Sequence, residues 1–261
     1  MAQGIFHDIS GRPRVLWGTA INTGSARAAE LAGRIGFDVV WIEMEHASAD
    51  LATAEALCVA SEAGGAIPMI RTNGYHRDHI LHALEVGGRI VVVPMVNDAD
   101  ATREIVKWGK FRPLGERGYN TRSRAAGFGL EPLPMEQMNH ETYLFPQIET
   151  LEAVRNLDEI LAVEGLGGLF FGPGDLSSDL GSPGNMADPE LIRIICDGIT
   201  RARAAGLHAA ILVGPGPLLD AAVDAGADLC IIGSDLGAMI KEWREQLAGR
   251  REKDQFPGWI G

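Results

Sequence analysis

Short apolar runs that alternate with amphipathic segments constrain the fold of this sequence more than any other feature. Eight such runs recur along the chain, and nearly all are uninterrupted instead of alternating between apolar and polar residues. Uninterrupted runs are typical of parallel strands that are covered on both faces. The predicted strands are residues 15–20, 38–44, 67–72, 89–95, 143–149, 168–175, 208–214 and 228–234.

Segments with a helical pattern lie between these runs. They are residues 25–36, 50–64, 77–87, 98–110, 151–165, 187–206, 216–226 and 235–250. Several end in glycine just before the next strand, and glycine takes the left-handed conformation that ends a helix at little cost. Eight strand-then-helix units predict an α/β fold, a single (β/α)8 TIM barrel over residues 1–261. A doubly wound open sheet is the alternative, but no G-x-G-x-x-G follows the first strand.

Composition limits the partners and the compartment. Lys plus Arg number 23 and Asp plus Glu number 35, so the net charge is −12. This acidity argues against nucleic acid or an anionic membrane as a partner. Three cysteines are an odd and sparse set, which predicts reduced thiols. Because we see neither a signal peptide nor a membrane-length apolar run, we expect a cytoplasmic protein.

One connection, residues 111–142, is far longer than barrel loops usually are. Within it, the stretch FRPLGERGYNTRSRAAGFG carries Arg112, Arg117, Arg122 and Arg124 against the single acid Glu116. Loops of this length inside compact domains are usually functional or disordered. We therefore predict an anion-binding active-site loop in which Arg117, Ser123 and Arg124 contact substrate, with a solvated loop as the alternative.

Catalytic groups of such barrels gather at the carboxyl ends of the strands. Glu149 and Asp175 stand there on adjacent strands, and two carboxylates with room for water are a typical site for Mg²⁺ or Mn²⁺. Two alternatives stay open. Each acid could cap the following helix, or the pair could be the acid and base of a glycosidase, although aromatic residues make up only 6% of the chain.

The second and third strands end in a histidine and an arginine. His46 follows Glu45, and a histidine that titrates near neutrality suits a general base. Arg71 ends an apolar strand, where a guanidinium must meet either an anionic ligand or a carboxylate such as Glu43 or Glu45. Backbone N–H groups at Gly174, at a helix start, could hold a substrate carboxylate.

Lysine is scarce, and its placement bears on the chemistry. The lysines are Lys107 and Lys110 in the fourth helix, Lys241 in the last helix and Lys253 in the tail. None ends a strand, so we expect no Schiff-base lysine. Activation of a carbonyl would then come from a metal and an arginine. We also expect no nucleotide cofactor.

Four runs together resemble the HpcH/HpaI family of class II, metal-dependent pyruvate aldolases over residues 12–247. They are GFDVVWIEMEHAS, PMIRT, PMVNDADATREIVKWGKFRPLGERG and QIETLEAVRNLDEILAVEGLGGLFFGPGDLSSDLG. The family includes 4-hydroxy-2-oxoheptanedioate and 2-keto-3-deoxy-sugar-acid aldolases. The resemblance implies that Glu149 and Asp175 hold Mg²⁺, Mn²⁺ or Co²⁺, which pyruvate chelates. It also implies that Arg71 stabilises the enolate and His46 acts as base.

The resemblance further implies an assembly, a hexamer built as a trimer of dimers that exchange the last helix. In relatives an acid from a neighbouring subunit helps poise the histidine, and Glu85 stands at that position here. Glu43 and Glu85 replace aspartates of many relatives, and Met44 replaces a glycine, so the aldehyde preference stays open. The tail, residues 251–261, carries aromatic residues that suggest docking on a neighbouring subunit.

The expected function is reversible cleavage of a 4-hydroxy-2-oxo acid into pyruvate and an aldehyde. The expected catalytic residues are His46, Arg71, Glu45 and Glu85, and the expected substrate-binding residues at the strand ends are Gln147, Gly174 and Asp175. An oxaloacetate decarboxylase or a lyase of the citrate-lyase β or malyl-CoA type is the alternative among enzymes. A non-catalytic protein that binds a keto acid would show ligand binding without turnover.

Overall fold

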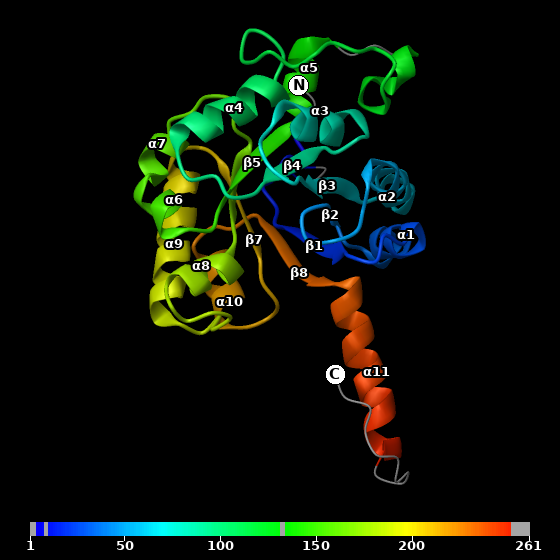
Figure 1. Cartoon of the computed structure of the whole chain (residues 1–261), viewed down its shortest axis with the longest axis vertical. Helices are drawn as coiled ribbons and strands as arrows, with labels where there is room; N and C mark the ends of the chain where they lie inside the picture. The colour runs from blue at the N-terminus through cyan, green and yellow to red at the C-terminus, as the bar shows by residue number, and fades with distance from the viewer. Residues whose placement is uncertain (1–3, 8–9, 131–133, 252–261) are drawn as a thin grey trace.

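The structure is a computed structural model that describes residues 4–7, 10–130 and 134–251, and it shows a closed barrel of parallel strands (Figure 1). The strands are β1 (Leu16–Ile21), β2 (Val39–Glu43), β3 (Ile67–Arg71), β4 (Ile90–Val93), β5 (Tyr143–Ile148), β6 (Gly168–Phe171), β7 (His208–Leu212) and β8 (Leu229–Ser234). They follow one another in chain order, and β8 pairs with β1 to close the barrel. The predicted (β/α)8 barrel is confirmed, and the open sheet is wrong.

Helices surround the strands. They are α1 (Ala26–Ile35), α2 (Leu51–Gly64), α3 (Arg77–Glu85), α4 (Ala99–Gly109), α5 (Met135–Glu141), α6 (Leu151–Arg155), α7 (Leu157–Leu161), α8 (Pro173–Asp179), α9 (Pro189–Ala204), α10 (Pro217–Asp224) and α11 (Asp235–Arg251), with a 3₁₀ segment η1 (Arg124–Gly129). Helix α2 shows how the sequence marks the ends of a helix. Asp50 caps its N-terminus, because the Asp50 side chain accepts the Thr53 N–H. Gly65 ends the same helix with a φ of 90°.

The predicted helix over 151–165 is wrong in one respect, because it is two short helices. Asn156 ends α6 and begins α7 with φ −91° and ψ 10°, outside the regular helical values. Its side chain donates to the Asn97 carbonyl at 2.9 Å. This tertiary contact interrupts the helix, and the pattern of apolar residues does not reveal it.

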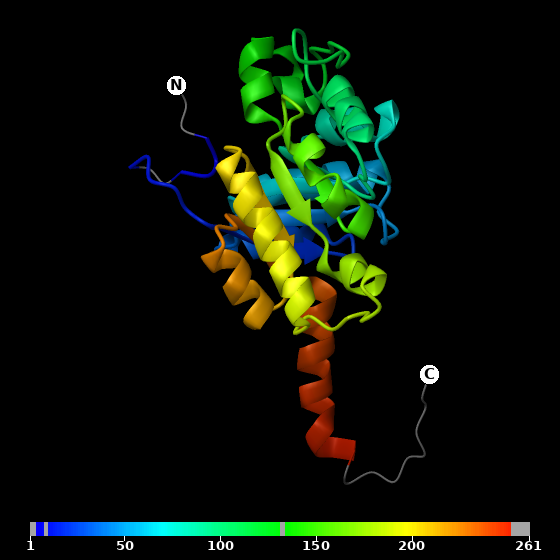
Figure 2. The ribbon, with the colours of Figure 1, turned by 90° about the vertical axis from the view of Figure 1, so that its left-hand side faces the viewer.

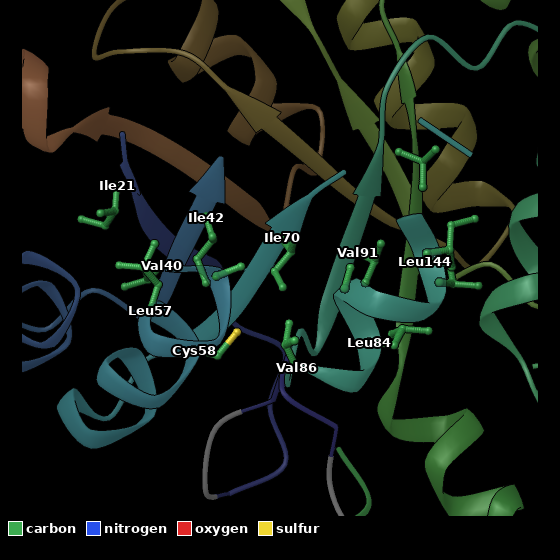
Figure 3. Close-up of a cluster of buried hydrophobic side chains, with 14 of the residues drawn as sticks. Ile21, Val40, Ile42, Leu57, Cys58, Ile70, Leu84, Val86, Val91 and Leu144 are labelled. Atoms are coloured by element: carbon green, nitrogen blue, oxygen red, sulfur yellow. The ribbon is translucent and has the colours of Figure 1, made fainter. Parts of the chain in front are cut away.

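The core has an inner and an outer part. Large buried side chains fill the barrel interior, including Trp41, Phe145 and Phe170. Apolar clusters between the strands and the helices form the outer part. Figure 3 shows one of these outer clusters, where side chains of α2 and α3 meet the outward-facing side chains of the first strands. The strands are therefore packed on both faces, which makes their ends a rigid platform.

The two ends of the barrel differ. We call the end with the strand carboxyl termini the mouth and the opposite end the closed end. The described part of the long loop, residues 111–130 and 134–142, lies at the closed end. Arg124 pairs with Glu62 in the last turn of α2, and Arg117 pairs with Glu85 at the end of α3. The long loop therefore does not lie over the mouth of its own barrel.

The last helix, α11, extends away from the barrel, at the other end of the molecule from α5 (Figures 1 and 2). Asp235 anchors its first turn by accepting the N–H groups of Asn22 and Thr23 at 2.9 and 3.2 Å. Its exposed apolar side chains are Leu236, Ile240, Trp243 and Leu247. Because these are spaced by three and four residues, they form one stripe, which we call the α11 stripe. No helix within the described ranges is long and apolar enough to cross a membrane.

The predicted tail, residues 251–261, lies outside the described residues except for Arg251, which ends α11.

Candidate active site

A buried glutamate at the end of β2 organises one side of the mouth. Glu43 is paired in register with Arg71 on β3 and is 2% exposed. One of its oxygens accepts the Arg71 Nε–H at 2.8 Å and the Trp41 indole N–H at 3.0 Å. The other accepts the backbone N–H groups of Glu45 at 2.7 Å and His46 at 3.1 Å. Glu43 therefore fixes both the arginine and the turn that carries the histidine.

The charge of Glu43 is secured by Arg71. Burial by itself would raise the pKa of Glu43, but the hydrogen bond and charge of Arg71 outweigh it and lower the pKa below its usual value. The sequence left open whether Arg71 meets a ligand or a carboxylate. The structure shows the carboxylate pairs, with Glu43 and also with Glu45, whose Oε2 is 3.1 Å from Arg71 Nη1. Glu43, which we named as a possible partner of Arg71 and as a departure from relatives but not as a site residue, is thus part of the site.

Glu45 and His46 lie together on the next turn of the chain. The Glu45 Oε2 atom is 3.7 Å from His46 Nε2, and the imidazole side chain is 66% exposed. Burial raises the pKa of Glu45, although the charges of Arg71 and His46 oppose the rise. An exposed imidazole beside a carboxyl group of raised pKa is suited to accept and return a proton.

Glu149 lies just after β5 and is 2% exposed. Its Oε1 accepts the Met95 backbone N–H at 2.6 Å, and its Oε2 accepts the Gln147 side-chain N–H. A Cβ at Gly172 would come within 2.9 Å of the same carboxylate, so glycine is needed there. Burial raises the pKa of Glu149 to about 7, and the charge of Asp175 adds to the rise while the Met95 N–H opposes it.

These residues fit a divalent cation. Glu149 has neutral N–H donors, and Asp175, in the first turn of α8, adds a second negative charge near it. Gln147 is 3% exposed, and its Oε1 is buried without a hydrogen-bond partner among the described residues. Buried oxygens that lack partners suit a hard cation with its waters, and Mg²⁺ is often held by one or two carboxylates. Within the described residues, no group of three or more His, Cys, Asp or Glu is placed to hold a metal.

The helix-capping alternative is wrong for Glu149. The side chain that caps α6 belongs to Thr150, which accepts the Ala153 N–H at 3.1 Å. Glu149 therefore has no capping role, and the charges of Asp175 and Arg71 lie near enough to influence its pKa.

Comparison with known proteins shows the family. Residues 16–241 match the family model described as HpcH/HpaI aldolase/citrate lyase. This chain belongs to that family. The predicted resemblance is confirmed, and it covers most of the barrel.

Relatives of this HpcH/HpaI family member include two aldolases. A 2-dehydro-3,6-dideoxy-6-sulfogluconate aldolase of Pseudomonas putida is 34% identical over 230 residues, which is 88% of this chain and 90% of that protein. A 2-keto-3-deoxy-L-rhamnonate aldolase of Escherichia coli O1:K1 is 36% identical over 221 residues, 84% of this chain and 82% of that protein. The crystal structure of an HpcH/HpaI aldolase from Desulfitobacterium hafniense has a TM-score of 0.85 at 26% identity, covering 94% of this chain and 96% of that chain.

Four predicted site residues of this family member lie away from the mouth. Glu85 and Arg117 form an ion pair at 3.2 Å, and the Arg117 guanidinium lies 4.7 Å from the centre of the Phe111 ring. Arg124 pairs with Glu62, and Ser123 directly precedes Arg124 on the same loop. The structure therefore brings Glu45, His46, Arg71, Gln147, Glu149 and Asp175 together, with Gly174 beside Asp175. It does not bring Glu85, Arg117, Ser123 or Arg124 to that mouth.

The described lysines also lie away from the strand ends. Lys110 is buried and donates to the Asn139 and Thr142 carbonyls at the end of α5, at 2.6 and 2.5 Å. Burial lowers the pKa of Lys110 to about 8, and the charge of Arg117 adds to this. Lys107 pairs with Glu104 on α4. Lys110 therefore joins the beginning of the long loop to its end.

Proposed function

We propose that this chain is a class II pyruvate aldolase that reversibly cleaves a 4-hydroxy-2-oxo acid into pyruvate and an aldehyde. The observation that carries the proposal is that carboxylates, an arginine and a histidine lie together at the mouth of the barrel. The buried carboxylate of Glu149 lies within electrostatic range of the exposed Asp175 and of Arg71. Arg71 in turn pairs with Glu45 beside His46. Membership of the family and the aldolase names of its relatives support the same reaction.

The side chains divide the work of cleavage. His46 Nε2 accepts the proton of the substrate's 4-hydroxyl group as the C3–C4 bond breaks and the aldehyde leaves. The electron pair of that bond passes into the 2-oxo group, where the Arg71 guanidinium stabilises the negative charge. The proton then returns to C3 and completes pyruvate. Glu43 holds Arg71 in place throughout, because its own charge is secured by that pair.

A divalent cation held by Glu149 and Asp175 would polarise the 2-oxo acid as a Lewis acid. Family aldolases generally depend on a divalent metal, and Mg²⁺, Mn²⁺ and Co²⁺ all suit oxygen ligands. Gln147 and the backbone N–H groups of Gly174 and Asp175 would orient the carboxylate of the substrate. The relatives' substrates named above are 2-oxo-3-deoxy acids, so the expected substrate is an anion of that class.

We further propose that the protein acts in the cytoplasm as a homo-oligomer, a hexamer built as a trimer of dimers that exchange α11. The exposed α11 stripe supports an exchanged helix. Glu85, Arg117, Ser123 and Arg124 would then serve the mouth of a neighbouring subunit, which accounts for their place at the closed end of their own barrel.

An assay of pyruvate release tests the proposal. Wild type, His46→Ala and the control His140→Ala, an exposed histidine on α5, are given a panel of 4-hydroxy-2-oxo acids with Mn²⁺. We expect pyruvate and an aldehyde from wild type and the control, and a rate at least about a hundredfold lower for His46→Ala. Ligand binding without any pyruvate would favour the non-catalytic alternative. Carbon dioxide release from oxaloacetate alone would favour the decarboxylase.

A further inference from the structure

Met95 has an unusual backbone for its residue type. It follows β4 and Pro94 at the mouth, and its φ is 55°, in the left-handed region that side chains with a Cβ seldom adopt. The residue is 52% exposed, so packing of its side chain does not offset the strain. A strained residue at an enzyme's mouth points to a task for its backbone.

The residues that follow Met95 are fixed in place by burial and hydrogen bonds. The next residue, Val96, is fully buried. Asn97 then ties the loop to the turn after β5, because its side-chain oxygen accepts the Thr150 hydroxyl at 2.6 Å and its carbonyl accepts the Asn156 side chain at 2.9 Å. The strained segment is therefore fastened to the chain on the far side of Glu149.

The backbone of Met95 donates a hydrogen bond to the carboxylate of Glu149. The Met95 N–H reaches Glu149 Oε1 at 2.6 Å, and Gln147 holds Oε2. A hydrogen bond to a carboxylate is strong, and two of them from fixed donors set the rotation of the carboxyl group. Both donors are neutral, so they orient Glu149 without supplying a positive charge that would compete with a cation.

We propose that Met95 is a positioning residue for Glu149, whose left-handed backbone serves to aim its amide N–H at Oε1 and so to orient the carboxylate beside Asp175. This rests on the proposed function, in which Glu149 binds a divalent cation. The backbone of Met95, and not its side chain, would orient Glu149. Substitutions that keep the left-handed backbone should therefore keep this orientation, and substitutions that disfavour it should not.

The test measures the affinity for Mn²⁺ alone, by titration calorimetry on metal-free protein, together with kcat and KM for pyruvate formation. Met95→Gly keeps the left-handed conformation without strain, and Met95→Leu is the control that keeps the strain and the bulk. Met95→Val adds a β-branch that disfavours the left-handed region and withdraws the N–H. We expect Gly and Leu within about twofold of wild type and Val weaker by about tenfold, a difference of about 1.4 kcal/mol.

A second variant removes only the hydrogen. Replacing Met95 by its α-hydroxy acid turns the Pro94–Met95 amide into an ester, and we expect the same loss of Mn²⁺ affinity as in Met95→Val. This variant decides the matter if Met95→Val does not fold. Wild-type affinity in the ester variant, or a loss in Met95→Gly equal to that in Met95→Val, would overturn the role of the N–H. Absence of Mn²⁺ binding by wild type would instead overturn the cation site itself, and the role of Met95 with it.

Discussion

Two buried glutamates at the mouth respond differently to burial because their partners differ. Glu43 faces the guanidinium of Arg71, and its pKa falls below the usual value. Glu149 faces neutral donors and the negative charge of Asp175, and burial raises its pKa to about 7. Glu43 is a fixed anion that holds other residues, whereas Glu149 forms hydrogen bonds to neutral donors but no ion pair with a described residue. That contrast separates a positioning role from a ligand role.

Glu149→Gln should stabilise the metal-free protein at pH 8. Since the folded pKa of about 7 lies above the ordinary value of 4.5, the stabilising effect of this group is full below pH 4.5 and is lost as the pH rises through 7. By pH 8 the wild-type charge costs about 3 kcal/mol, which the amide avoids. In urea unfolding with a chelator present, the free energy of unfolding of Glu149→Gln should exceed that of wild type by roughly 2–3 kcal/mol at pH 8. The two should differ little at pH 4.5. The control is Glu152→Gln, an exposed acid on α6; equal stability of Glu149→Gln and wild type at pH 8 would contradict the account.

Glu43→Gln should have the opposite effect on stability. Breaking this buried pair leaves Arg71 with Glu45 as its remaining carboxylate partner and costs on the order of 3 kcal/mol. Because the folded pKa of Glu43 is lowered, its stabilising effect is present above the unfolded value and is lost as the pH falls through the folded value. The loss should therefore be large at pH 7 and shrink in acid. Glu30→Gln, which breaks an exposed pair with Arg34, is the control and should change stability by less than about 1 kcal/mol.

At the scale of elements, strands were predictable and short helices were not. Uninterrupted apolar runs place the strands to within a few residues, because parallel strands are buried on both faces. Helices α5 and α8 are each 7 residues long, too short for a pattern of apolar residues to show. The position of the long loop needed only the chain direction, since a connection from a helix to a strand lies at the closed end. Arg117 and Arg124 show that the composition of a loop does not reveal at which end of the barrel it lies, because both pair with glutamates at the closed end.

We predict that the α11 stripe holds the proposed oligomer together. Ile240→Lys places a charge on the stripe, and burying that charge against another subunit is costly. Glu245→Lys, on the opposite face of the same helix, introduces the same side chain and is the matched control. Light scattering coupled to size exclusion should show a smaller species for Ile240→Lys only. The same mass for both variants and wild type would argue against α11 as an interface.

At the scale of the molecule, the barrel gathers a site from distant parts of the chain. Glu43, Arg71, Glu149 and Asp175 come from β2, β3, the turn after β5 and α8. The position of each at a strand end was readable from the sequence. The hydrogen bond from Met95 was not, because a positive φ at a residue other than glycine leaves no trace in the sequence. Likewise, a single sequence does not show which residues a neighbouring subunit contributes.

Mixing inactive variants tests whether the closed end of one subunit serves the mouth of another. In a mixed oligomer of His46→Ala and Arg124→Ala, a subunit with an intact mouth can receive an intact Arg124 from its neighbour, so part of the activity should return. The control mixes His46→Ala with Arg71→Ala, and no mouth in it is complete. The measurement is pyruvate formation after unfolding and refolding the chains together. Equal activity in the two mixtures would place Arg124 outside the site.

Exchange of the C3 protons of pyruvate in D₂O, followed by NMR before and after removal of metal, tests the central claim most directly. It reports the proposed step in which His46 moves a proton while the site stabilises the enolate, and it needs no knowledge of the aldehyde. We predict exchange by the wild type with Mn²⁺, loss of exchange after dialysis against a chelator, recovery when Mn²⁺ returns, and none in Glu149→Gln under any of these conditions. Undiminished exchange by the chelated protein or by Glu149→Gln would contradict a reaction that depends on the Glu149 and Asp175 pair.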